Sequence, residues 1–460
     1  MSTLSNLTGI QGRDATLAPS DPPRYDPWSD ADSVIPSPLP GTRWPEGNHR
    51  ATIPTLQEAR RLLGPRSDST RLAMQKLFHR QSLHASRSRL RLGQHDRGES
   101  YIFGGGDYCH RDQAGVNRHL PLHVKVVRLK RWRLKKGQIL DLSAHHGDWP
   151  GLHFREELYV HIEIDHLEVE PGAVLEVHGN VLVIKCREVA RIAPETQSHS
   201  TSAEPGPWLE IRILGTRHPA YGITRPSSAV DGKAGHAGGD GRDSSATEVV
   251  STPFGARLAV DTEQSMDGQP GQHGGDGEDA TSGMAGGMAM LAVLLLGELK
   301  GFPPGGVRIF AQAGAGRPGG HGGKGGNGGN GGDGADGLDG IDGPIPGGRG
   351  GAGGDGGNGG NGGHGGHGGL ASNVFVQVSR ASIPCIETVS LPSKGGAPGR
   401  GGAAGRGGCG GVHGKLAFPS PDTPEGQRGP DGGHGRAGRN GRPGRSRPAA
   451  TIHLLNVSEK

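Results

Sequence analysis

The sequence predicts a mainly β protein that also contains polyglycine II: a short helical N-terminal region, a β-solenoid or β-sandwich base, and then a bundle of six period-three glycine helices. Among 460 residues there are 88 glycines and 34 prolines, whereas hydrophobic residues make up 32% and aromatic residues 4%. So little apolar side chain cannot supply a conventional core over the whole length. The glycines also recur at every third position in bounded runs, which low-complexity disorder does not require.

The first half of the chain predicts three regions in order. Residues 1–50 are polar and proline-rich, which is typical of a disordered arm. Region 51–110 is expected to be helical, with Thr55 as a helix N-cap and apolar residues at helical spacing after it. In region 118–225 the apolar period changes to two, and turn signals separate short strands. Such evenly spaced strands favour a β-solenoid or a β-sandwich.

The glycine half, residues 226–446, contains six runs with glycine at every third position, of which the second holds from 268 to 277 and recurs in phase at 283 and 286. A closing strand is expected at 447–460. A period of three suits a left-handed helix of three residues per turn with a rise of about 3.1 Å, in which the glycines form a bare face for close backbone approach. The turn Pro344-Ile345-Pro346 joins two Gly-Gly-X runs and indicates a chain that folds back on itself. A collagen-like trimer is the alternative, and the sixth run favours it most. The runs span 232–241, 268–286, 316–343, 347–369, 396–414 and 426–444.

The Gly-Gly-X runs with proline-containing turns resemble the polyglycine II bundles in the tip adhesins of bacteriophage long tail fibres and, more distantly, the springtail glycine-rich antifreeze proteins. The resemblance covers about residues 230 to 446 and depends on the repeat, not on catalytic motifs. For the phage family it implies binding to a host surface by loops at the ends of a rigid bundle.

Two basic segments are candidate binding sites for an anionic polymer. In the sixth run, arginine recurs every third residue at Arg436, Arg439, Arg442 and Arg445, so the four side chains are expected on one face about 9 Å apart. The alternative is that these arginines solvate the bundle or pair with aspartates such as Asp336, Asp339 and Asp342. The second segment surrounds one tryptophan with basic residues, and its alternative is an edge strand protected by charge. It comprises Lys125, Arg128, Lys130, Arg131, Trp132 and Arg133.

Histidine is abundant, with 23 in the chain, but metal binding is expected only if two runs bring histidines together. Histidines three residues apart on one run are separated by about 9 Å, which is too far for a compact site. If residues of the third and fourth runs pair when their numbers sum to 688, His321 lies beside His367. No other pair is expected to bind metal, and no cofactor is predicted.

These observations predict a non-enzymatic structural or adhesive protein whose rigid bundle presents loops or cationic columns to a surface ligand. The alternatives are the collagen-like trimer and an enzyme or toxin carried by region 51–225, with the bundle as scaffold. An anionic polysaccharide or another cell-surface ligand is expected ahead of nucleic acid, and a monomer ahead of a trimer. No classical signal peptide or membrane span is expected, and the only long apolar run, 288–296, is too short to span a bilayer. Localisation stays open between export by a non-classical route and the cytoplasm.

Overall fold

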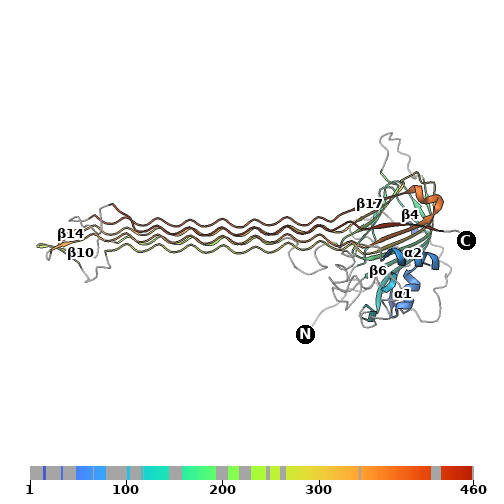
Figure 1. Ribbon diagram of the computed structural model, residues 1–460, viewed down its shortest axis with the longest axis horizontal. Helices are drawn as coiled ribbons and strands as arrows, with labels where there is room; N and C mark the ends of the chain where they lie inside the picture. The colour runs from blue at the N-terminus through green and yellow to red at the C-terminus, as the bar shows by residue number, and fades with distance from the viewer. Residues whose placement is uncertain are drawn as a thin grey trace, which may run out of the picture.

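The computed structural model shows a base of sheets and helices from which a long, narrow shaft projects (Figure 1). The shaft consists of the glycine-rich segments, and the far end of the shaft carries a small sheet. The described residues are 14–16, 33–34, 48–65, 67–78, 101–103, 116–117, 119–144, 158–192, 206–216, 229–244, 249–258, 266–340, 343–415 and 426–457.

The larger sheet of the base has the strand order β1-β3-β4-β6-β8-β12-β16-β18, with β2 also paired to β4. All of these pairs are parallel except β3 with β4, which is antiparallel. The strands are β1 (Asp14–Thr16), β2 (Ser33–Val34), β3 (Asn48–Ile53), β4 (Leu122–Leu134), β6 (Leu158–Val169), β8 (Val181–Arg191), β12 (Ala292–Lys300), β16 (Val374–Ser379) and β18 (Ile452–Val457).

The smaller sheet is entirely parallel, with the order β17-β13-β9-β7-β5. From β4 onward, successive strands of the base alternate between the two sheets, and the chain leaves for the shaft after β9, β13 and β17. The two sheets are therefore completed only after the chain has travelled along the shaft three times. The strands are β5 (Ile139–Asp141), β7 (Ala173–His178), β9 (Leu209–Leu214), β13 (Val307–Gln312) and β17 (Ile386–Leu391).

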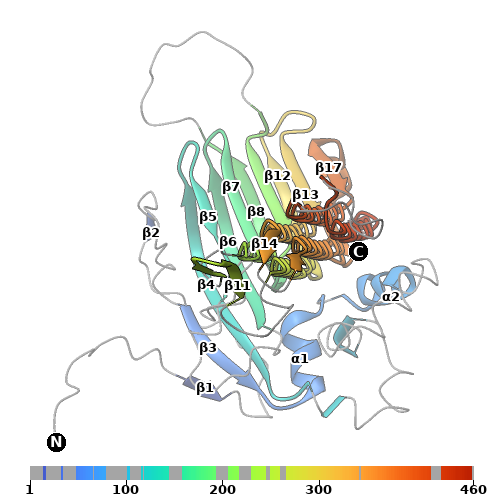
Figure 2. The same ribbon diagram turned by 90° about the vertical axis from the view of Figure 1, so that its left-hand side faces the viewer.

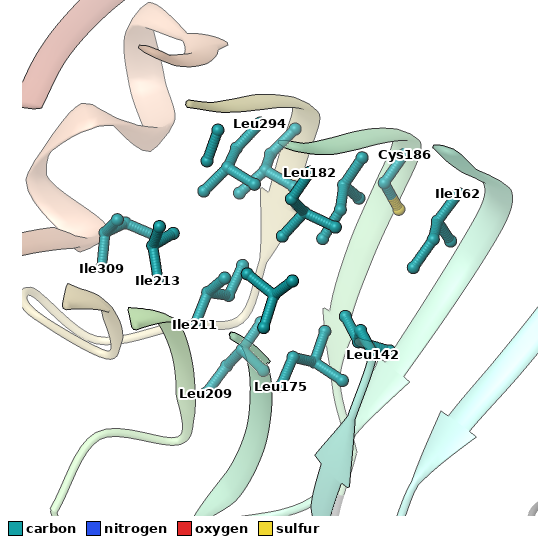
Figure 3. Packing of buried hydrophobic residues seen from close by; sticks show 14 of the residues in the cluster. Leu142, Ile162, Leu175, Leu182, Cys186, Leu209, Ile211, Ile213, Leu294 and Ile309 are labelled. Carbon is teal, nitrogen blue, oxygen red and sulfur yellow. The ribbon is translucent and has the colours of Figure 1, made fainter. Parts of the chain in front are cut away.

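The main core lies between the two sheets (Figure 3). Alternation along β6 explains how it forms, because Ile162 and Ile164 face this core while Tyr159 points to the opposite face. Leu294 of β12 and Ile309 of β13 contribute from the strands that lie between shaft segments, and both are fully buried.

A second core lies on the other face of the larger sheet, where helices α1 (Leu56–Leu63) and α2 (Asp68–Phe78) contribute buried side chains. Thr55 begins α1 as expected, because its Oγ1 accepts a hydrogen bond from the backbone N–H of Glu58 at 3.3 Å. A 3-10 helix, η4 (Arg380–Cys385), connects β16 to β17.

The predicted fold class is therefore wrong. The base is neither a closed β-solenoid nor the antiparallel sandwich typical of short alternating strands, since it has two separate, mostly parallel sheets with helices on an outer face. The glycine-rich part is also not a helix bundle that follows a finished base. Its segments are long excursions between consecutive strands of one mixed α/β fold, and β12, β13, β16, β17 and β18 return between them to the two sheets.

Six extended glycine segments form the shaft in two layers (Figure 2). We number them in chain order as 229–244, 266–288, 313–337, 347–371, 393–415 and 426–447. The first, third and fifth segments run in one direction and form one layer, in which the third segment bonds to both of the others. The bond from the Gly232 N–H to the His321 carbonyl (2.8 Å) is an example. The second, fourth and sixth segments form the other layer in the same way. Antiparallel bonds such as Gly360 N–H to the Gly323 carbonyl (2.8 Å) join the layers.

The number of neighbours of each segment explains its glycine content. The third and fourth segments each bond to four other segments, and their Gly-Gly-X repeat leaves two of three positions bare. The first and sixth each bond to two, and mostly one glycine in three suffices. At such contacts an added Cβ on Gly357 would overlap the carbonyl group of Gly275.

A four-stranded sheet lies at the far end of the shaft (Figure 1). Its strands come from the excursion after β9 and the excursion after β13: β10 (Val249–Thr252), β11 (Gly255–Leu258), β14 (Leu338–Gly340) and β15 (Gly343–Ile345). The two hairpins meet through a parallel contact between Ala256 and Gly340.

Candidate functional site

Polar side chains on the flat faces of the shaft cap backbone N–H groups of the next segment in the same layer. In one row Asp276 Oδ1 accepts from the N–H of Asn358 at 2.6 Å, and Asn358 Oδ1 accepts from the N–H of Arg436 at 2.9 Å. His364 Nδ1 likewise accepts from the N–H of Arg442 at 2.8 Å. Side chains of Asp, Asn, His and Ser all place an acceptor at this short reach, so the non-glycine column fixes the register of the shaft.

A row of such caps ends on the last segment of its layer, the fifth or the sixth, because no further segment of that layer remains to be capped. At several of these positions the side chain is long and basic. Arg400 on the fifth segment is one example, and its backbone N–H donates to His321 Nδ1 at 3.0 Å. The charge across the shaft is consequently uneven. The first two segments carry seven acidic side chains against two basic ones, whereas the last two carry ten basic side chains against one acidic.

We call the acidic side chains of the first two segments the acidic edge and the basic side chains of the last two the basic edge. The members of both edges are exposed except Arg447, which is partly buried, and among the described residues no ion pair involves them. The acidic edge comprises Asp231, Asp240, Asp243, Asp267, Asp276, Glu278 and Asp279; the basic edge comprises Lys394, Arg400, Arg406, Lys415, Arg428, Arg436, Arg439, Arg442, Arg445 and Arg447.

The predicted arginine column, Arg436, Arg439, Arg442 and Arg445, lies on one face of the sixth segment and is exposed. The fourth segment holds each backbone N–H through a side-chain acceptor, and the guanidinium groups stay available. The alternative pairing with Asp336 does not form: no arginine of the column pairs with it, and its Oδ1 accepts from the backbone N–H of Lys415 at 2.8 Å. The side chain of Asp339 and the whole of Asp342 lie outside what the structure describes.

The second predicted basic site is built into the base. Trp132 is 1% exposed in the main core, and Lys125 is 6% exposed. Arg128 and Arg131 form ion pairs with Glu163 and Glu168 of the neighbouring strand β6, at 3.5 Å and 3.3 Å, and Arg133 pairs at 3.0 Å with Glu170, which directly follows that strand. Lys130 is exposed. The strand is not at an edge of the sheet either, since β4 has β3 on one side and β6 on the other.

The structure does not bring His321 and His367 together. The third and fourth segments pair with numbers that sum to 683, as in Gly360 with Gly323, and not 688. Each histidine instead caps its own layer: His321 Nδ1 accepts from Arg400, and His367 Nδ1 accepts from the N–H of Arg445 at 3.0 Å. The register prediction assumed that side chains of the two segments face each other, whereas they face outward from opposite layers.

Sequence reasoning missed a group of possible metal ligands in the base. Asp141 of β5 and Glu176 and His178 of β7 offer ligand atoms that all lie within 4.8 Å of one another. Polar neighbours already contact this group: Ser143 Oγ donates to Asp141 at 2.5 Å, and Arg212 lies 4.0 Å from Glu176. These contacts account for the cluster without a metal ion.

A cavity of about 250 Å³ opens on the outer face of the larger sheet. Glu163, Lys185 and Gln377 line it, together with Cys186. Lys185 Nζ donates to the carbonyl of Leu62 at 2.7 Å, which ties α1 to the sheet. Burial raises the pKa of Cys186 to about 12, so its thiol stays protonated at neutral pH and is a poor nucleophile.

The far end of the shaft exposes an aromatic side chain. Phe254 is 87% exposed in the turn between β10 and β11. Thr252 closes this turn, because its Oγ1 donates to the carbonyl of Gly255 at 2.7 Å. The turn thus presents a large apolar side chain within the small sheet at the far end of the shaft, where Figure 1 shows β10 and β14.

Comparison of the chain with protein-family models, with known proteins and with solved structures gave no match. No helix within the described residues is long and apolar enough to cross a membrane.

Proposed function

We propose that this chain is a non-enzymatic structural and adhesive protein in which the base carries a rigid shaft and the tip of the shaft contacts a cell-surface polysaccharide. The observation that carries the proposal is Phe254, exposed at the end of a shaft that stands clear of the base. Exposed aromatic side chains are frequent anchors of binding surfaces. The resemblance to phage tip adhesins supports the same function, since it implies binding through loops at the end of a bundle.

Two further observations weigh against the alternatives. Glycine N–H groups of the shaft bond to carbonyls of the same chain, so they are not free for a collagen-like trimer. In the base, the Cys186 side chain belongs to the main core (Figure 3), where burial keeps it a thiol, and Lys185 beside it is bonded to α1. Neither side chain is poised for nucleophilic chemistry.

The test is binding of the labelled full chain to immobilised neutral and anionic polysaccharides. We expect wild-type protein to bind at least one of them and Phe254→Ala to reduce that binding about tenfold or more, which is the loss expected of an interface anchor. Leu72→Ala, on the exposed face of α2 in the base, is the matched control and should bind as wild type does. Equal binding by Phe254→Ala, or no binding of wild-type protein to any polysaccharide, would contradict the proposal.

A further inference from the structure

The two long edges of the shaft carry opposite charge, and three rows of capping side chains run from an aspartate at one edge to an arginine at the other. One row begins with Asp279 on the second segment, continues through Asn361 on the fourth and ends at Arg439 on the sixth. The row from Asp276 to Arg436 repeats this order one triplet away, and in the layer of the first, third and fifth segments a row runs from Asp231 to Arg400.

Both edges face solvent, apart from the partly buried Arg447. The carboxylate of Asp279 uses Oδ1 to cap Asn361, and its other oxygen reaches the amide of the same residue at 3.3 Å. These hydrogen bonds lower the pKa of Asp279, so it is negatively charged at neutral pH. On the opposite edge the arginine side chains have no ion pair among the described residues, as shown above.

From this geometry we infer that shafts of two copies of this chain associate side by side, with the basic edge of one against the acidic edge of the other. Most charged side chains of a segment lie a multiple of three residues apart, and three residues span about 9 Å along the shaft, as between Asp276 and Asp279 on one edge and between Arg436 and Arg439 on the other. Complementary charge of this kind sets the register of an interface and steers its formation. An anionic polymer would use only the basic edge, whereas a second copy of the chain would use both.

The shape of the molecule indicates that paired shafts are antiparallel. The base is wider than the shaft (Figure 1), so two parallel shafts in register would bring their bases into overlap. Rotation by 180° about the line that joins the two edges reverses the shaft direction without exchanging the edges. Acidic-to-basic contact is therefore retained, and because the contact is heterologous it can repeat from copy to copy. The association differs from a collagen-like trimer, since each shaft is already complete within one chain.

The test is sedimentation velocity of the full chain at low and high salt. At about 20 mM salt, where charges act over roughly 20 Å, we expect species heavier than a monomer whose mass rises with protein concentration; at about 1 M salt, where the range falls to about 3 Å, we expect the monomer. A monomer under both conditions would overturn the inference. So would a discrete assembly that salt does not dissociate.

Two variants identify the edges without disturbing the shaft. Asp267→Asn, Asp276→Asn and Asp279→Asn together remove three of the seven negative charges of the acidic edge but keep the Oδ1 acceptors. Arg436→Gln, Arg439→Gln, Arg442→Gln and Arg445→Gln remove four of the ten positive charges of the basic edge, from side chains that make no ion pair among the described residues. We expect each variant to be monomeric at low salt. The matched control replaces exposed basic residues of the base, Arg61, Arg71, Lys76 and Arg380, with glutamine and should associate as wild type does.

The outcomes separate self-association from the alternatives. If the arginine variant dissociates but the aspartate variant does not, the partner of the basic edge is not the acidic edge, and the inference is wrong. If wild-type protein stays monomeric but binds heparin, and the arginine variant does not, the basic edge binds an anionic polymer instead. Phe254→Ala should still associate, so failure of this inference is distinguishable from failure of the proposed adhesive function.

Discussion

The base and the shaft of this protein are held together in opposite ways. In the base, branched apolar side chains from two sheets fill the space between them, and residues such as Leu182 and Leu294 are 0% exposed. In the shaft, contact depends on side chains being absent, since glycines let one backbone bond directly to the next. Truncating a buried side chain should therefore destabilise the base, whereas adding a side chain to a glycine should destabilise the shaft.

The largest effect should come from the base core. Leu294→Ala removes a fully buried side chain from β12, and we expect it to lower the free energy of unfolding by about 2–5 kcal/mol. All five tryptophans lie outside the glycine segments, so urea unfolding followed by tryptophan fluorescence reports on the base. Leu391→Ala, 42% exposed on β17, is the control and should cost less than about 1 kcal/mol. Equal losses in the two variants would contradict a core between the sheets.

In the shaft, the addition of a single methyl group should cause the next largest loss of stability. Gly357→Ala places a Cβ against the carbonyl of Gly275 and 2.9 Å from that of Gly274, both of them backbone atoms that cannot move aside alone. We expect a loss of about 1–3 kcal/mol, seen as faster hydrogen exchange of glycine amides in the fourth segment while tryptophan fluorescence is unchanged.

Gly433→Ala is the matched control for this substitution. Its added Cβ would lie 3.3 Å from a side-chain oxygen of Asp355, which can rotate. Exchange in this variant should stay within the wild-type range. If both alanines are tolerated equally, close backbone approach is not what holds the fourth segment in place.

The sequence was sufficient for features that are local and periodic. The three-residue spacing of glycine is also the spacing of the hydrogen bonds between segments, as the series from Gly232 to Gly241 shows. Thr55 could be assigned as a helix cap because a cap depends on residues within one turn.

The pairing of distant strands could not be read in the same way. β8 and β12 are adjacent in the larger sheet although about a hundred residues of chain separate them, and apolar alternation does not say which strand is the neighbour. The glycine half was therefore predicted as a separate domain, although strands within it, such as β12, pair with strands of the base. The basic strand β4 was misinterpreted for the same reason, because its charge is balanced by Glu163 and Glu168 of β6 and by Glu170, which follows β6.

Two sequence signals could have predicted more of the shaft. Glycine density increases from mostly one in three to two in three as a segment gains neighbours, so the repeat itself distinguishes outer segments from inner ones. The third position also changes in kind, from Asp, Asn and His on earlier segments to Arg on the sixth, for example from Asn358 to Arg436. This change marks where capping ends and an open edge begins.

The smallest predicted effect is a loss of shaft stability at low pH. Hydrogen bonds from the backbone N–H and side-chain amide of Asn361 hold the pKa of Asp279 below its ordinary value of 3.8. A carboxyl group whose pKa is lower in the folded protein stabilises the fold above its unfolded-state pKa, and this contribution is lost as the pH falls through the lowered value. The shaft should thus lose protection below about pH 4, within the range where carboxylates in general titrate.

Asp279→Asn tests this dependence directly, because asparagine keeps an Oδ1 acceptor for Asn361 but does not titrate in this range. We expect hydrogen exchange of the fourth segment near Asn361 to increase from pH 7 to pH 3 by a smaller factor in this variant than in wild-type protein, after correction for intrinsic exchange. Asp279→Ala, which removes the acceptor, should exchange faster at both pH values. An unchanged pH response in Asp279→Asn would show that the carboxylate charge contributes nothing to the row, and that the shaft is held at this point by backbone hydrogen bonds alone.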